Sequence, residues 1–388
     1  MKVFQKIRKS WLANGAAICT SIVMIISCTN AQANAPTAPT PPSEKSIKIA
    51  LLLDTSNSMD GLINQAKAQL WRIVNRLSEA ECEGEVPTLQ IALYEYGNDR
   101  LVSSEGYIRQ VVGLTNDLDL ISSELFRLTT NGGSEYCGHV IQTSLNQLEW
   151  DDADDLQMIF IAGNEPFSQG SVSYVEACTR ALQSGVVVNT IFCGDFNQGI
   201  NQMWKHGSDI TSGSYMSINQ NSQTVFIPSP YDDQITQLNS QLNTTYIGYG
   251  VQGNARMQMQ VAQDEAAESI ATENLVQRAA SKSTFNYSNS HWDLVDAYRD
   301  ETVDLDGIDQ ETLPEEFRGM STEELEEAIE AKMEERQQIQ AQILELNQMR
   351  EDFVAQEQAN QSGESQLGAV MLQAIQEQAE SKNFVFPE

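Results

Sequence analysis

Three segments of the chain are continuously apolar, without the alternation of apolar and polar residues that marks a half-exposed strand. They are 49–53, 156–162 and 186–193. A strand that is apolar on both faces is typical of the centre of a parallel sheet, because helices cover both sides of such a sheet. Three further segments are predicted to be strands, the last of them at an edge: 89–96, 108–114 and 214–218.

Helical spacing of apolar residues fills the intervals between these strands. The predicted helices cover 62–77, 118–128, 135–148, 172–183 and 204–210. Strands that alternate with helices need right-handed crossovers and predict an α/β fold with a doubly wound, mostly parallel sheet. We expect this domain to cover 46–228, since a proline-containing segment, Ile227-Pro228-Ser229-Pro230, follows it.

The first apolar strand ends in a group of oxygen-bearing side chains, Asp54, Ser56 and Ser58. In open α/β sheets, ligands bind beyond the carboxyl ends of the strands, where these residues are expected to lie. A carboxylate with two hydroxyls suits Mg²⁺, Mn²⁺ or Ca²⁺ better than it suits soft metals. The alternative interpretation is a polar turn whose serines cap the next helix.

The Asp-x-Ser-x-Ser pattern of Asp54–Ser58 resembles the metal-ion-dependent adhesion site of von Willebrand factor A (VWA) domains, and the similarity covers 46–228. The resemblance implies two more metal-binding loops. In the second, Ser134 after Gly132-Gly133 matches the threonine of the family. In the third, the family's aspartate is missing from Gly163-Asn164-Glu165, so Asn164 or Glu165 would have to supply an oxygen. The resemblance therefore implies a variant, weakened site for Mg²⁺, or for Mn²⁺ or Ca²⁺.

The chain beyond 228 is predicted to be helical. We expect a helical or irregular extension over 229–320, a long helix over 321–358 and a mobile tail over 359–388. Ser321 and Glu324 form a capping box that begins the long helix. Its apolar residues follow a heptad frame that Lys332, Arg336 and Arg350 interrupt. This helix either pairs with a second copy as a partial coiled coil, folds against the preceding helices, or stands alone in solvent.

The N-terminus has the pattern of an export signal. A basic segment precedes an apolar run that ends in Ile25-Ile26-Ser27-Cys28, which resembles the lipobox of bacterial lipoproteins. Residues 1–28 would then be the signal region, with Cys28 as the lipid-bearing residue, and 29–45 a Pro/Thr tether. The interpretation places the protein in the bacterial envelope, at the outer membrane, facing the periplasm or the surface. Cleavage after Ala33 or Ala35, which would leave a soluble periplasmic protein, is the alternative.

Export to an oxidising compartment would permit disulfides among Cys82, Cys137, Cys178 and Cys193. Both Cys137 and Cys193 are expected at the ligand-binding edge of the sheet, which makes a bond between them a hypothesis. Free buried cysteines are the alternative.

Charge and motifs narrow the function classes. The net charge of -31 argues against nucleic acid as a partner. The three histidines are scattered, and phosphate-binding, nucleophile-elbow and zinc-protease motifs are missing, so we expect no enzyme. The favoured function is capture of a carboxylate-bearing protein partner by the metal site. One alternative is an envelope scaffold that acts through its C-terminal helices, and a metal-dependent hydrolase is a minor one.

Overall fold

The computed structural model describes residues 42–150, 154–219, 226–358 and 367–386. Contacts group Ala38–Glu388 into one compact unit. The expected signal region with Cys28 and most of the tether lie outside the described residues. The expected domain boundary at 228 stays a prediction.

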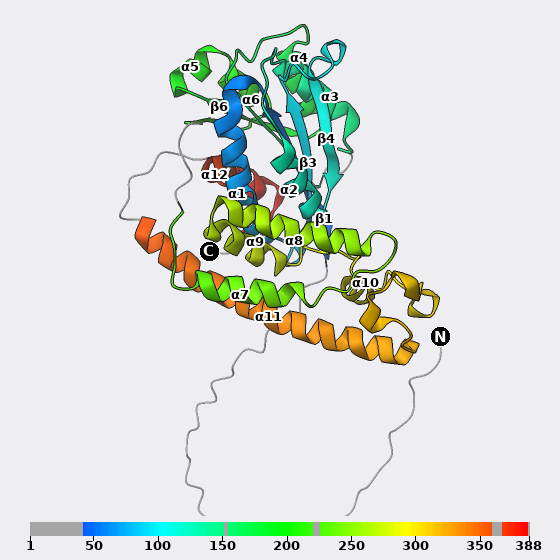
Figure 1. The fold of residues 1–388 in the computed structure, drawn as a ribbon. Helices are drawn as coiled ribbons and strands as arrows, with labels where there is room; N and C mark the ends of the chain where they lie inside the picture. Colours follow the sequence, from blue (N-terminus) through cyan, green and yellow to red (C-terminus); the bar gives the residue numbers. More distant parts are fainter. Residues whose placement is uncertain (1–41, 151–153, 220–225, 359–366, 387–388) are drawn as a thin grey trace, which may run out of the picture. The chain divides into compact units, whose positions relative to one another are not determined.

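A six-stranded sheet forms the centre of this unit (Figure 1). All neighbouring strands are parallel except the first pair, which is antiparallel and joined by the loop 97–107. The predicted α/β fold with a doubly wound, mostly parallel sheet is therefore confirmed. The strand order is β4 (Ile108–Thr115), β3 (Val86–Tyr96), β1 (Pro42–Asp54), β5 (Leu156–Gly163), β6 (Val187–Cys193) and β7 (Tyr215–Ile218).

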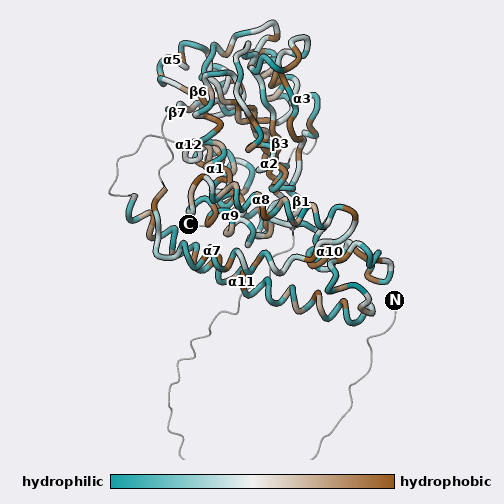
Figure 2. Tube along the Cα trace, in the orientation of Figure 1, coloured by the Kyte–Doolittle hydropathy of each residue, from teal (hydrophilic) through white to brown (hydrophobic). Residues whose placement is uncertain are grey.

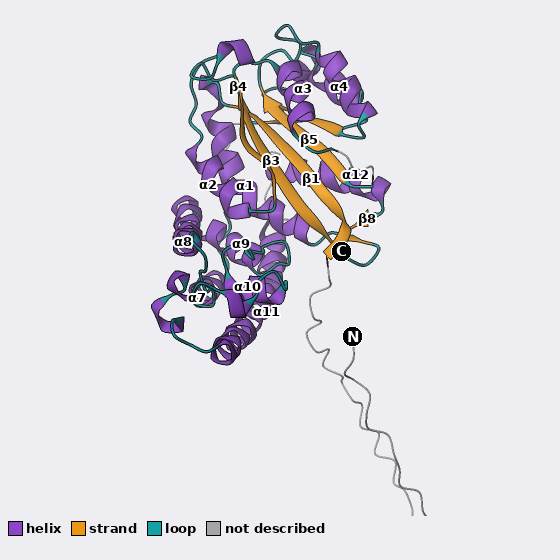
Figure 3. Ribbon diagram, turned by 90° about the vertical axis from the view of Figure 1, so that its right-hand side faces the viewer, coloured by secondary structure: helices purple, strands orange, loops and turns teal. Residues whose placement is uncertain are grey.

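Both faces of the sheet are buried, as the apolar strands predict. Along β1, Ile47 and Ile49 belong to one hydrophobic cluster, whereas Ala50 and Leu52 belong to a second cluster on the other face. Figure 3 shows α1 (Asp60–Ser78) and α2 (Leu118–Arg127) on one side of the sheet and α3 (Cys137–Gln147) and α4 (Tyr174–Gln183) on the other. The first cluster includes α1 and α2; the second includes α3, α4 and α6 (Trp204–Asp209).

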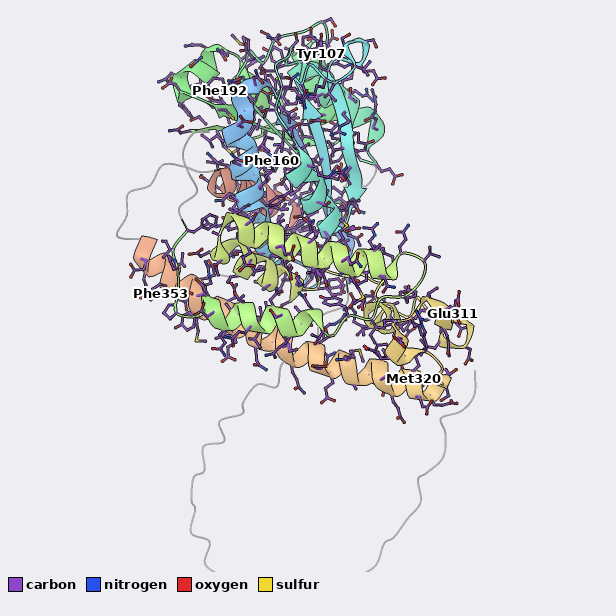
Figure 4. The ribbon with its side chains drawn as sticks, in the orientation of Figure 1. Tyr107, Phe160, Phe192, Glu311, Met320 and Phe353 are labelled. Carbon is purple, nitrogen blue, oxygen red and sulfur yellow. The ribbon has the colours of Figure 1, made fainter. Side chains whose placement is uncertain are left out.

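The buried aromatic side chains follow the same division. Phe160 of β5 packs in the α1 cluster and Phe192 of β6 packs in the α3 cluster, and both are labelled in Figure 4. Two short elements were not expected, β2 (Glu81–Cys82) and α5 (Phe196–Asn201).

The C-terminus differs from the mobile tail that we expected over 359–388. Residues 367–379 form α12 (Leu367–Ala379), and β8 (Phe384–Val385) pairs with β2 in a second, antiparallel sheet. Met371, Ile375 and Phe384 are buried in the cluster of α1. The helix covers part of a sheet face that would otherwise expose apolar side chains, and this burial holds the segment in place.

We predict that Ile375→Val lowers the free energy of unfolding by about 1 kcal/mol, because it removes one methylene from a fully buried site. The urea midpoint should fall without a change in slope. The matched control is Val385→Ala, since Val385 on the adjacent strand is exposed and its truncation should leave the midpoint unchanged. An unchanged midpoint for Ile375→Val would contradict the packing of α12 on the sheet.

Among the described residues 226–358, four α-helices precede the long helix. They are α7 (Asp232–Asn243), α8 (Gly253–Ile270), α9 (Thr272–Lys282) and α10 (Leu294–Arg299). The long helix α11 (Thr322–Gln358) begins at the predicted capping box, in which the Ser321 amide donates to Glu324 and the Glu324 amide donates to Ser321.

The helix α11 folds against the preceding helices α7, α9 and α10, which was one of the three alternatives that the sequence left open. Most of α11 is hydrophilic (Figure 2). Two of the residues that interrupt its heptad frame are buried ion-pair partners: Arg336 contacts Asp293 and Asp296, and Arg350 contacts Asp232. Self-association through this helix stays a prediction.

Candidate functional site

Asp54 occupies the carboxyl end of β1 and is completely buried. Its Oδ1 accepts a hydrogen bond of 2.7 Å from the amide of Ser56, which bends the chain into the following loop. Its Oδ2 has no hydrogen-bond partner among the described residues. The hydroxyls of Ser56 and Ser58 are 3.4 Å apart, so the structure brings the first three predicted residues together.

Glu135 is the residue that the sequence analysis missed. Its side chain adjoins Asp54 and is only 4% exposed, and its Oε2 also lacks a partner among the described residues. The position of Gly97 confirms this proximity. A Cβ atom built there would lie 2.8 Å from Asp54 Oδ1 and 2.8 Å from Glu135 Cγ. Gly97 also has a positive φ of 79°, so this turn between the two carboxyls requires glycine.

The pairing of two carboxyls has a clear electrostatic cost. Burial raises the pKa of Asp54 well above its usual value, and the neighbouring Glu135 carboxylate raises it further. Burial likewise raises the pKa of Glu135. Like charges in a site with little water disfavour ionisation unless a cation compensates them.

A backbone hydrogen bond holds Glu135, which follows the second predicted metal-binding loop (Gly132-Gly133-Ser134). The Glu135 amide donates a 2.6 Å hydrogen bond to Oε1 of Gln169, which belongs to the loop after β5. Ser134 is half-buried and makes no side-chain hydrogen bond with the residues that the structure describes. Its role as a metal ligand stays a prediction. The sequence signal for Glu135 is its place directly after Gly133-Ser134, but the family resemblance implies a hydroxyl ligand there and so points to Ser134.

The third loop supplies Asn164 to the same site. Its Nδ2 donates a 3.1 Å hydrogen bond to Oγ of Ser58, and its Oδ1 is buried without a partner in the described part of the chain. The side chain of Glu165 is exposed, whereas its carbonyl accepts a hydrogen bond from Trp204. Asn164 therefore contacts the predicted site and Glu165 lies at its margin.

The donor set suits a hard divalent cation. Three buried acceptor oxygens, from Asp54, Glu135 and Asn164, have no donor among the described residues. Oxygen-only sets of carboxylate, amide and hydroxyl groups are the ligands that Mg²⁺ and Ca²⁺ prefer. Across the described residues, no group of three or more His, Cys, Asp and Glu side chains could hold a metal. A site here would accordingly have two carboxylates, with neutral oxygens completing it.

The Cys137–Cys193 disulfide hypothesis was wrong. Cys82, Cys137, Cys178 and Cys193 are all free and buried. The physical reason is the sheet itself: Cys137 packs in the α3 cluster, whereas Cys193 packs in the α1 cluster on the opposite face. Both lie toward the expected edge, yet a layer of strands separates their side chains.

The described residues include no helix with both the length and the apolar character needed to cross a membrane.

Tyr107, in the loop between β3 and β4, marks the end of the sheet at which the candidate site lies (Figure 4).

Solved structures that are similar to part of the chain include VWA domains. No family model and no curated protein match the chain. Similar solved structures include the SpRpn10 VWA domain (16% identity, 46% of this chain, 90% of that chain, TM-score 0.35). Another is the conserved hypothetical protein BatB from Bacteroides thetaiotaomicron (14% identity, 45% of this chain, 90% of that chain, TM-score 0.33).

A third is proximal thread matrix protein 1 from the mussel byssus with a zinc-occupied MIDAS motif (14% identity, 45% of this chain, TM-score 0.34). The alignment spans 41% of that protein's chain, and thus less than half of its length. With identities and TM-scores this low, the assignment of a doubly wound α/β fold rests on the strand order of this chain itself.

Proposed function

We propose that the protein is a binding module of the bacterial cell envelope that captures a carboxylate-bearing protein partner through a divalent cation. The cation, Mg²⁺ or Mn²⁺, would be held by Asp54, Ser56, Ser58, Glu135 and Asn164. The observation that carries this proposal is the buried pair of Asp54 and Glu135, whose Oδ2 and Oε2 atoms lack partners among the described residues. Two adjacent buried carboxylates are costly alone and favourable around a cation.

The residues of this site would have two roles, charge balance and orientation of the ligand groups. Asp54 and Glu135 would balance the two positive charges, while the Ser56 amide orients Asp54. Asn164 orients the Ser58 hydroxyl by donating to it. A bound divalent ion would supply a Lewis acid with a coordination position left for a partner's carboxylate. Asn57 and Ser58 are exposed, which leaves this side of the site accessible.

Location in the envelope is the second part of the proposal. The basic segment at the N-terminus and the Ile25–Cys28 run support export and lipid attachment at Cys28. An anchor of this kind would hold the module at the outer membrane, with the Pro/Thr tether that follows Cys28 as a spacer.

Calorimetric titration of the purified protein with MgCl₂ and MnCl₂ tests the metal site. We expect saturable binding that Asp54→Ala abolishes, because the substitution removes one of two anionic ligands. Asp99→Asn is the matched control: Asp99 is exposed and also lies in a loop at this end of the sheet, so binding should persist. Equal heats from the wild-type protein and Asp54→Ala would reject the site.

A further inference from the structure

Exposed carboxylates border the metal site at this edge of the sheet. The segments that follow the strands here, or contact the loop after β1, are 55–60, 97–107, 129–136, 164–173 and 194–203. Their exposed charged side chains are mostly acidic: the acids are Asp60, Asp99, Glu105, Glu165 and Asp195, and the base is Arg100. A partner that approaches the cation therefore enters a negative electrostatic field.

Asp99 lies beside the first metal-binding loop. A Cβ atom built on Gly132 would be 3.5 Å from Oδ2 of Asp99 and 4.0 Å from Nδ2 of Asn57, so both side chains adjoin this glycine. The Asp99 amide donates a 2.6 Å hydrogen bond to the Gly132 carbonyl, which fixes the position of the residue. The Asp99 carboxylate is exposed and has no hydrogen-bond or ion-pair partner among the described residues.

Glu165 brings a second exposed carboxylate to the site from the third loop. It directly follows Asn164, whose side chain donates to the first loop, and its own carboxylate has no partner in the described part of the chain. Burial is the main cause of the raised pKa of Glu135, and the charge of Glu165 adds to it, so the two charges interact. Asp60 accepts a hydrogen bond from Thr130, a neutral partner that leaves the charge of Asp60 uncompensated.

The charge of the metal-loaded site decides which carboxylates it can accept. Asp54 and Glu135 would balance the two charges of a divalent ion, so a partner's carboxylate adds a further negative charge between Asp99 and Glu165. Like charges disfavour its approach, whereas a lysine or arginine beside the partner's carboxylate would pair with the exposed acids. An acidic partner segment is thus disfavoured, and a segment of mixed charge is favoured.

We propose that the partner's carboxylate lies between basic residues, so that the ion binds the carboxylate while Asp99 and Glu165 pair with the neighbouring cations. This inference rests on the proposed function, because the metal holds the carboxylate. It adds the chemical class of the partner, which is a protein segment in which an aspartate or glutamate is flanked by lysine or arginine.

Peptide-detected NMR titrations of the purified protein in MgCl₂ test this inference with four capped pentapeptides. Between terminal glycines, the probes carry Lys-Asp-Lys, Gly-Asp-Gly, Glu-Asp-Glu or, without the carboxylate, Lys-Asn-Lys. At low salt we expect Lys-Asp-Lys to bind about fivefold tighter than Gly-Asp-Gly, because two exposed ion pairs form, and Glu-Asp-Glu to bind more weakly than both. The preference should shrink in about 0.3 M NaCl, since salt screens exposed charges.

The double variant Asp99→Asn/Glu165→Gln removes both flanking carboxylates. It should reduce the preference for Lys-Asp-Lys over Gly-Asp-Gly to less than about twofold, while calorimetric metal binding persists. The matched control is Glu81→Gln/Glu85→Gln, which removes two exposed carboxylates just before β3, at the opposite end of the sheet. The preference of this control should equal that of the wild-type protein.

A metal-loaded protein that binds Glu-Asp-Glu as tightly as Lys-Asp-Lys, or binds none of the probes, would overturn this inference and leave the metal site in place. Equal binding of Lys-Asn-Lys and Lys-Asp-Lys would overturn it too, as would undiminished binding of Lys-Asp-Lys in chelator or by Asp54→Ala. In those cases the acidic border attracts cations by itself. Failure of the proposed function is visible separately, as absence of metal binding in the calorimetric titration, and would remove this inference as well.

Discussion

Replacing Arg278 by alanine should lower the free energy of unfolding by about 3–5 kcal/mol, measured by urea denaturation. The Arg278 guanidinium is completely buried between two carboxylates, at 2.6 Å from Asp119 and 2.6 Å from Asp264. It also lies 4.6 Å from the ring of Trp71. This contact joins α9 to α1, α2 and α8. Without the guanidinium, Asp264 would still contact Lys282, whereas Asp119 would keep the hydrogen bond from the Tyr287 hydroxyl but no ion pair among the described residues.

A neighbouring arginine provides the matched control for this substitution. Arg256 pairs with Asp117 at 2.9 Å, two residues before Asp119, but its side chain is 25% exposed. Partly solvated pairs contribute little, so Arg256→Ala should cost less than about 1 kcal/mol. Similar losses for the two variants would contradict the buried network as the main attachment of the C-terminal helices to α1 and α2.

Replacing Glu135 by glutamine should weaken Mg²⁺ or Mn²⁺ binding by about two orders of magnitude, because anionic ligand count sets the affinity of oxygen sites. The protein without metal should respond in the opposite direction. Since burial raises the pKa of Glu135, removal of its charge relieves an unfavourable ionisation, and the metal-free variant should melt at a higher temperature than the wild-type protein. Calorimetry and thermal melts in chelator-treated buffer measure the two effects.

Glu165→Gln removes the same charge from the adjacent loop and serves as the control. Because the Glu165 side chain is exposed, this change should alter metal affinity less than about threefold. A larger loss for Glu165→Gln than for Glu135→Gln would assign the missing third-loop carboxylate to Glu165. It would also refute the placement of Glu135 in the metal site.

The strands and most helices could be predicted because their signals are local. Unbroken apolar segments such as 49–53 mark strands covered on both faces, and the Ser321–Glu324 capping box marks the start of α11 within one residue. The Asp54, Ser56 and Ser58 cluster could be predicted for the same reason, because all three residues follow a single strand.

Contacts between distant segments escaped prediction. Arg336 interrupts a heptad frame when α11 is considered alone, yet it is a buried partner of Asp293 and Asp296. The segment that forms α12 carries no strong local signal for an ordered helix. Its Met371 and Ile375 are buried in the hydrophobic cluster on the α1 face of the sheet. Isolated helical segments of this length are marginal, and tertiary packing decides whether they stay ordered.

The α/β class, the apolar strands and the oxygen cluster after β1 could be predicted from the amino-acid sequence, since each depends on residues a few positions apart. Three features became visible only in the folded chain: Glu135 lies beside Asp54, Cys137 and Cys193 lie on opposite faces of the sheet, and α12 packs back on the sheet. These outcomes depend on the crossing of distant segments, and side-chain periodicity along one segment carries no information about what that segment meets.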